Sequence, residues 1–139
     1  MRAHATAKDD PVIGRYSKSD ELAIEATSSA LGLLARALRN APSSVELVIP
    51  PEQDAGPYDG FLVEVVVEPT TGKLRIARRG GTLLISGGDE SRAVLAKNIE
   101  SLAEGTLGDH IHVEYHPDHY YLDPSTASLV VERIHARGQ

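Results

Sequence analysis

Four of the six histidines lie within residues 109–122, and imidazole is the side chain that proteins use most often to bind metals. His110, His112 and His116 recur at even spacings, so an extended strand would place them on one face. Residues two apart on a strand are separated by ~6.6–6.8 Å, and two imidazoles at that separation can both reach a Zn²⁺ ion. The spacing therefore raises the hypothesis of a metal-binding protein or a metal-dependent hydrolase that uses these three histidines.

The same face has a simpler interpretation as the solvent side of a half-buried strand. The alternate positions carry apolar side chains, as in any antiparallel strand with one face in water: Ile111, Val113 and Tyr115. Glu114 or His119 would have to complete the ligand set, but Glu114 follows His112 too closely for the cupin pattern. We therefore favour a solvated histidine face, with Tyr115 in the core, and expect no cofactor.

A third interpretation of this stretch is a protein-binding surface. Tyr120 and Tyr121 are adjacent in the chain, so an extended backbone points them in opposite directions and leaves one exposed. Tyrosine provides rigid contact area, and Pro117 and Pro124 stiffen the loop, which lowers the entropy lost on binding. The predicted contact residues are His112, Glu114, His116, Asp118, His119, Tyr120 and Asp123.

Other catalytic motifs find no support. Gly80-Gly81 separates two expected strands, and Gly87-Gly88 precedes a helix without the pattern of a P-loop or a dinucleotide-binding loop. No G-x-S-x-G nucleophile elbow occurs, and the chain has no cysteine for thiolate chemistry or zinc–sulfur sites. We therefore expect a protein that is not an enzyme.

Length, net charge and hydropathy limit the kinds of protein that this chain can be. A length of 139 residues fits a single domain, here residues 19–139, preceded by a polar tail over residues 1–18. The net charge of −6 argues against a nucleic-acid binder and permits attraction to a basic partner. No apolar run reaches the ~18–20 residues that span a bilayer, and the N-terminus has no apolar signal segment, so we expect a cytoplasmic protein without a membrane partner.

Hydrophobic periodicity predicts the elements that hold the histidine stretch. Apolar residues at spacings of three and four predict a helix from Ser19 that ends before Pro42, and a second helix from Asp89 to about Ala103, with Asp89 as its cap and Gly105 as its end. Alternation predicts strands within 45–49, 61–67, 74–76, 83–85, 110–116 and 129–131, of which the second, third and fourth form an antiparallel meander. The predicted fold is α+β, with the order α-β-β-β-β-α-β-β: a mostly antiparallel sheet of about six strands with two helices on one face.

Two runs of residues resemble a known family. The first run is His110, His112, Tyr115, Pro117, His119, Leu122, Pro124, Leu129 and Val131. The second run is Leu83, Ile85, Ser91, Leu95, Asn98 and Ile99. Both resemble small actinobacterial proteins that serve as immunity proteins against polymorphic toxins, and most resemble the family called immunity protein thirty-two. The resemblance extends over about residues 74 to 131.

That resemblance implies a bacterial toxin inhibitor, a non-enzymatic protein that binds and neutralises a cognate toxin domain. It carries over no functional residues, so the contact residues named above come from their types and spacing alone. A homodimer is compatible with the sequence, and an adjacent reading frame encoding a secreted toxin would identify the partner.

Overall fold

The computed structural model describes residues 3–5, 11–50, 56–105 and 109–135. Within these ranges the chain folds as α+β, with two helices and two five-stranded sheets that each mix parallel and antiparallel pairs. The α+β class is confirmed, whereas the prediction of about six strands in one sheet is wrong in detail. No helix in the described part is long and apolar enough to cross a membrane.

The first sheet has the strand order β1-β4-β6-β8-β7. Its strands are β1 (Ala3–Ala5), β4 (Ser43–Glu46), β6 (Glu64–Pro69), β8 (Thr82–Gly87) and β7 (Arg75–Arg79). The second sheet has the order β5-β2-β3-β10-β9. Its strands are β5 (Gly60–Leu62), β2 (Val12–Tyr16), β3 (Glu21–Ala26), β10 (Ser128–Arg133) and β9 (His110–Val113).

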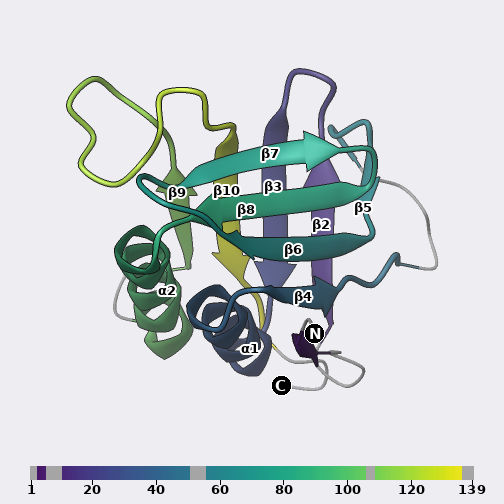
Figure 1. The fold of residues 1–139 in the computed structure, drawn as a ribbon. Coiled ribbons are helices and arrows are strands. Elements are labelled where there is room, and N and C mark those ends of the chain that lie inside the picture. Colours follow the sequence, from purple (N-terminus) through teal and green to yellow (C-terminus); the bar gives the residue numbers. More distant parts are fainter. Residues whose placement is uncertain (1–2, 6–10, 51–55, 106–108, 136–139) are drawn as a thin grey trace.

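The two sheets face each other, and the strands of the first run across those of the second (Figure 1). Helices α1 (Ser28–Arg39) and α2 (Asp89–Glu104) lie side by side at one end of this pair of sheets (Figure 1). Side chains from both sheets and both helices form one buried apolar cluster, including Leu22, Leu34, Val65, Leu95 and Val131. The core is therefore aliphatic, as an aromatic-poor chain requires.

The segment predicted to begin the first helix is a strand. Leu22, Ile24 and Ala26 are buried and alternate with more exposed residues along β3, so their period is two. Helix α1 starts only at Ser28, where the Thr27 hydroxyl accepts a hydrogen bond from the Ala30 amide. The strand leads directly into the helix, and the spacing from Ile24 of the strand to Leu31 of the helix matches a helical period. The predicted helix therefore began too early.

The expected strand over 61–67 is two strands in different sheets. Residues up to Leu62 pair with β2, and residues from Glu64 pair with β4 and β8. Val63 joins them, with its amide donating to Gly81 O and its carbonyl accepting from the Leu47 amide. The alternation of apolar residues continues from 61 to 67 although the chain passes from the second sheet to the first at Val63. Periodicity alone does not reveal this change of sheet.

The predicted meander is also wrong. Strands β7 and β8 do form an antiparallel hairpin around Gly80, but β6 pairs with β8 in parallel, so β7 lies at the edge rather than in the middle. The N-terminal segment differs as well: Val12–Tyr16 is β2, and Val12 is fully buried, although we expected a polar tail over 1–18. The parts of that tail at 1–2 and 6–10 lie outside the described residues.

Helix α2 begins and ends close to the predicted positions. Its N-cap is Gly88 rather than Asp89. Asp89 lies in the first turn of the helix, where the positive end of the helix dipole stabilises a carboxylate. Gly105 ends the helix with a φ of 83°, a left-handed conformation that glycine adopts at little cost.

Arg92 joins the two helices and the first sheet. Its side chain is almost fully buried, donates from Nε to Gly87 O at 2.9 Å and from one terminal nitrogen to Leu38 O at 2.6 Å, and pairs with the Asp89 carboxylate. Leu38 O lies in the last turn of α1, where carbonyls lack helical partners and a cation is favourable. Arg92 therefore holds the start of α2 against the end of α1.

We predict that Arg92→Met lowers the free energy of unfolding by about 2–4 kcal/mol, because Leu38 O loses its donor, Gly87 O keeps only the Thr70 amide and the Asp89 carboxylate loses its partner. Urea denaturation monitored by circular dichroism measures this loss. Lys97→Met, at an exposed position of the same helix, is the matched control and should leave the urea midpoint nearly unchanged. Equal midpoints for both variants would contradict the assigned role of Arg92.

Candidate functional site

The histidine stretch forms the edge strand β9 and a long connection to β10. Strand β9 ends at Val113, three residues earlier than predicted, so His116 lies beyond the strand. His110 and His112 are exposed on β9, where they pair with Glu132 and Val130 of β10. The connection has two parts: residues 114–120, which we call the lobe, and residues 121–127, which we call the anchored segment.

The anchored segment runs along the outer edge of β7. The Leu74 amide donates to Tyr121 O and Leu74 O accepts from the Asp123 amide, both at 2.8 Å. Further along, the Ala127 amide donates to Ile76 O at 2.8 Å. These backbone bonds fix the end of the lobe to the first sheet.

Asp123 organises the turn inside the anchored segment. Its carboxylate accepts from the Ser125 amide at 2.8 Å and from the Ser125 hydroxyl at 2.6 Å, and both bonds lower the pKa of Asp123. Ser125 in turn accepts from Arg75 Nε at 2.9 Å. The predicted contact residue Asp123 therefore already has a structural task.

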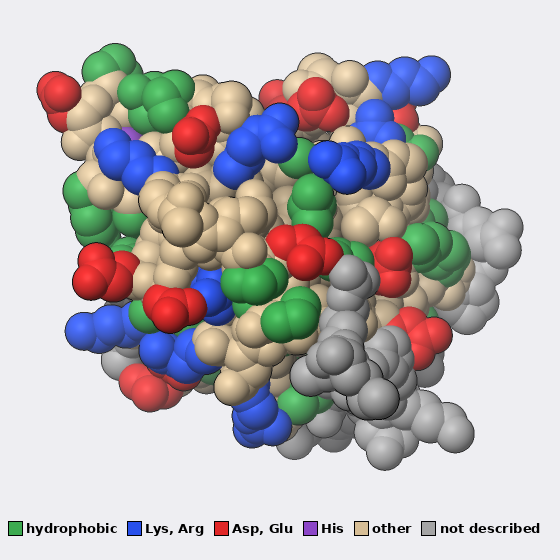
Figure 2. Space-filling model, viewed as in Figure 1, with side chains coloured by type: hydrophobic (Ala, Val, Ile, Leu, Met, Phe, Trp, Pro, Cys, Tyr) green, Lys and Arg blue, Asp and Glu red, His purple; other side chains and the backbone are tan. Residues whose placement is uncertain are grey.

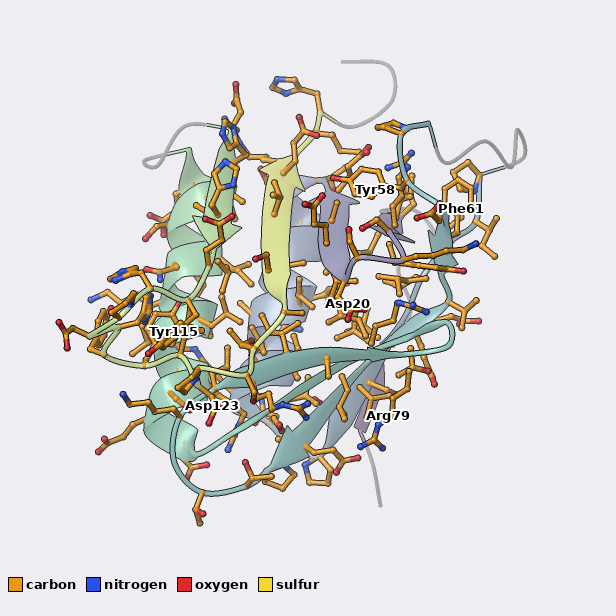
Figure 3. All side chains as sticks on the ribbon, turned by 90° about the horizontal axis from the view of Figure 1, so that it is seen from above. Asp20, Tyr58, Phe61, Arg79, Tyr115 and Asp123 are labelled. Atoms are coloured by element: carbon orange, nitrogen blue, oxygen red, sulfur yellow. The ribbon has the colours of Figure 1, made fainter. Side chains whose placement is uncertain are left out.

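The lobe projects into solvent next to α2 (Figure 1). Figure 3 places Tyr115 and Asp123 on the same side of the molecule, far from Tyr58 and Phe61. The most exposed large apolar side chain is Tyr120, at 72 %, within the described residues. Four of the predicted contact residues in the lobe are exposed: Glu114, His116, Asp118 and Tyr120. The fifth, His119, is half-buried.

Two expectations about the tyrosines have different outcomes. Tyr120 is exposed and Tyr121 is buried, as their adjacent positions predicted. Tyr115 is not in the core, because β9 ends before it and its side chain remains 36 % exposed. The alternation that placed Tyr115 inside assumed a longer strand.

His119 holds the lobe in its conformation. Its Nδ1 accepts hydrogen bonds from the amides of Leu122 at 3.2 Å and Tyr121 at 3.4 Å, which requires a neutral ring with the proton on Nε2. The His119 carbonyl accepts from Lys73 Nζ at 3.1 Å. Desolvation by burial, followed by the charges of His116 and Lys73, lowers the pKa of His119.

Aromatic rings form a continuous row from the lobe to the anchored segment. The His116 and His119 rings meet edge to face at 4.8 Å, and the His119 ring is parallel to that of Tyr120 at 5.6 Å. Tyr120 meets Tyr121 edge to face at 5.1 Å. This row restrains Tyr120 although its ring is exposed.

The histidines proposed as metal ligands do not converge. The His110 and His112 rings lie 5.1 Å apart on β9, whereas His116 packs against His119 in the lobe. In the ranges that the structure describes, no group of three or more His, Cys, Asp or Glu side chains has the arrangement of a metal site. The early end of β9 is the physical reason for their separation.

A cleft of about 590 Å³ opens beside the lobe, and we call it the α2 cleft. Its walls are the turn at 70–73, the first turns of α2 and the two rings of Tyr120 and Tyr121. The sequence pattern does not predict this cleft, because the cleft joins segments that are far apart in the chain. A second hollow of about 450 Å³ lies at the other end of β7, between residues 19–21 and 125–128.

The profile of the family described as "Immunity protein 32" matches residues 82–134. This segment of the chain resembles that family. The match covers less than half of the chain and contains β8, α2, β9, the lobe, the anchored segment and β10. No curated protein and no solved structure matches the chain.

We predict that acid loosens the junction of the lobe with the anchored segment. A lowered pKa means that the folded form resists protonation, so His119 stabilises the fold fully above its ordinary pKa of 6.5 and loses this contribution as the pH falls through its lowered value. Protonated Nδ1 can no longer accept from the amides of Tyr121 and Leu122. Their hydrogen exchange, corrected for intrinsic rates, should accelerate between about pH 8 and about pH 5.

The control variant is His119→Asn, whose side-chain oxygen can accept from the same amides but does not titrate. Its exchange at residues 121 and 122 should show no such pH dependence. Unchanged protection of the original chain across this range would contradict the assigned role of His119.

Proposed function

We propose that the chain is an immunity-type protein that binds a cognate bacterial toxin domain and neutralises it without catalysis. The resemblance of residues 82–134 to the family described as Immunity protein 32 supports this class. All seven predicted contact residues fall inside the matched segment. The function would be exerted in the cytoplasm of the producing or a related cell, where the toxin domain would otherwise act.

The observation that carries the assignment of the site is Tyr120. An aromatic ring with 72 % of its surface exposed buries apolar area when a partner covers it, and its stacking on His119 limits the entropy lost on binding. Exposed polar residues lie in the same lobe, and such residues are typical of the rim of a protein interface. The proposed contact surface comprises His112, Glu114, His116, Asp118, His119, Tyr120 and Asp123.

We predict that Glu114→Lys or Asp118→Lys weakens binding of the cognate toxin domain by about tenfold or more, because a positive charge replaces a negative one that would attract a basic toxin surface. Tyr120→Ala should have a similar effect through lost contact area. The Glu114 and Tyr120 side chains are exposed, so their melting temperatures should stay within a few degrees, whereas Asp118→Lys should also lower the melting temperature slightly because Asp118 has a φ of 71°. Titration calorimetry measures the affinities.

Glu104→Lys is the matched control, an exposed charge reversal at the far end of α2. It should leave the affinity for the toxin domain unchanged. If Glu104→Lys and Glu114→Lys weaken binding equally, the effect comes from net charge and the proposed contact surface is wrong.

A further inference from the structure

Strand β9 is the last strand of the second sheet, and within the described residues no further strand lies beyond it. On its other side it pairs with β10, where the Arg133 amide donates to Asp109 O at 2.7 Å. The main-chain groups of successive residues in an antiparallel strand point alternately to its two sides, so Ile111 also bonds toward β10. The amides and carbonyls of His110 and His112 therefore point to the outer edge.

The next pair of strands supports this alternation. The Ile134 amide donates to Ala26 O at 2.9 Å, so the even-numbered residues of β10 bond toward β3 and its odd-numbered residues bond toward β9. In the ranges that the structure describes, no hydrogen bond joins the main-chain groups of His110 or His112 to another residue. Both residues are exposed. The outer edge of β9 thus presents two donors and two acceptors.

The corresponding edge of the first sheet is protected. Its edge strand β7 bonds to the anchored segment through Leu74 and Ile76. The outer face of that sheet also carries basic side chains along β7 and acidic side chains over β6 (Figure 2). Covering segments and charged side chains both hinder the pairing of a sheet edge with other chains. The exposed side chains of β9 are imidazoles, and no covering segment bonds to this edge in the described part of the chain.

The two faces of β9 differ in chemistry. Ile111 packs against the core from the inner face but remains partly exposed at the edge, whereas Val113 is buried. His110 and His112 lie on the opposite face, in solvent. A segment laid along this edge can therefore cover the exposed part of Ile111 with an apolar side chain while its alternate residues lie beside the imidazoles.

We propose that the protein partner adds an extended segment to the outer edge of β9, with hydrogen bonds to the main-chain groups of His110 and His112 and an apolar side chain against Ile111. This inference rests on the proposed function, because it names how the same partner is bound. Main-chain pairing of this kind provides affinity, and alternate side chains provide specificity. Strand β9 leads directly into the lobe at Glu114, so a partner that covers the lobe also reaches this edge.

A second copy of the chain fits the edge less well. Strand β9 has four residues, so pairing with it provides few hydrogen bonds and needs additional contacts to be stable. A symmetric antiparallel pair that used the same groups would set His110 of each chain opposite His112 of the other. Four imidazoles would then lie side by side on one face, where like charges on protonation disfavour the pair. A partner that also covers the lobe gains the additional contacts.

Amide hydrogen exchange, resolved by residue with NMR of the ¹⁵N-labelled chain, tests the pairing. In the free chain we expect the amides of Ile111 and Val113 to be protected, because they bond to β10, and those of His110 and His112 to exchange freely. In complex with the cognate toxin domain, the amides of His110 and His112 should exchange about tenfold more slowly or less.

A pair of variants at one position separates main-chain pairing from side-chain contact. His112→Pro removes the outward-pointing amide without removing a bond to β10, and proline is tolerated on edge strands. His112→Ala is the matched control, because it removes the same imidazole and keeps the amide. We expect the proline variant to bind the toxin domain about tenfold more weakly than the alanine variant in titration calorimetry.

Several results would overturn the inference. If the toxin domain protects residues 114–120 but leaves the exchange of His110 and His112 unchanged, the edge is not paired and the proposed function stands. Equal affinities of the two His112 variants would have the same meaning. Slow exchange of both amides in the free chain, together with a dimer in analytical ultracentrifugation, would identify a second copy as the occupant. If the toxin domain does not bind at all, the proposed function fails and this inference fails with it.

Discussion

Residues 121–127 lie along the outer edge of β7 and provide hydrogen-bond partners that an edge strand otherwise lacks. Unpaired main-chain groups at a sheet edge recruit other chains, and proteins commonly cover such edges. Here the cover is the second half of the connection between β9 and β10, joined to β7 through Leu74 and Ile76. The connection therefore bridges the two sheets, since β9 and β10 belong to the second and β7 to the first.

This constraint supports the proposal that the long exposed loop is a contact surface. The lobe is held at one end by β9 and at the other by the anchored segment, and His119 fastens the junction through the amides of residues 121 and 122. A loop fixed at both ends loses less conformational entropy when a partner covers it. Tyr120 can then remain exposed in a defined orientation, because the stacked His119 ring and the adjacent Tyr121 ring restrain it.

The α2 cleft depends on the same arrangement. Tyr121 belongs to the anchored segment, and the opposite wall belongs to α2, whose first turn Arg92 holds against α1 and β8. The lobe, the cleft and the start of α2 therefore form one continuous region. All of it except the turn at 70–73 lies within the segment that resembles the immunity family.

Local pattern was enough to predict elements whose period is uninterrupted. The helical spacing of Leu95, Ile99 and Leu102 predicted α2, and the β7–β8 hairpin followed from Gly80-Gly81. Periodicity failed where one pattern passed through a structural boundary: alternation at Val63, between two sheets, and helical spacing at Thr27, between β3 and α1. Pairings between distant segments leave no local trace, which is why the parallel β6–β8 pair, the anchored segment and the α2 cleft could not be predicted.

For the predicted contact residues as well, the sequence predicts local features but not contacts between distant segments. Side-chain type and turn residues indicated an exposed stretch around 112–123, and the structure places these residues at the surface with His119 and Asp123 half-buried. What spacing did not reveal is that these two have structural bonds of their own. The metal hypothesis required a strand through His116, and only the end of β9 at Val113 separates that histidine from the other two.

We propose that a protein partner binds at the lobe and its anchored end. Hydrogen exchange of the chain alone and in complex with a cognate toxin domain tests this proposal directly. We expect added protection to be concentrated in residues 112–123 and at the first turn of α2. Protection confined to the outer face of β4, β6 and β8, or to α1, with residues 112–123 unchanged, would contradict it.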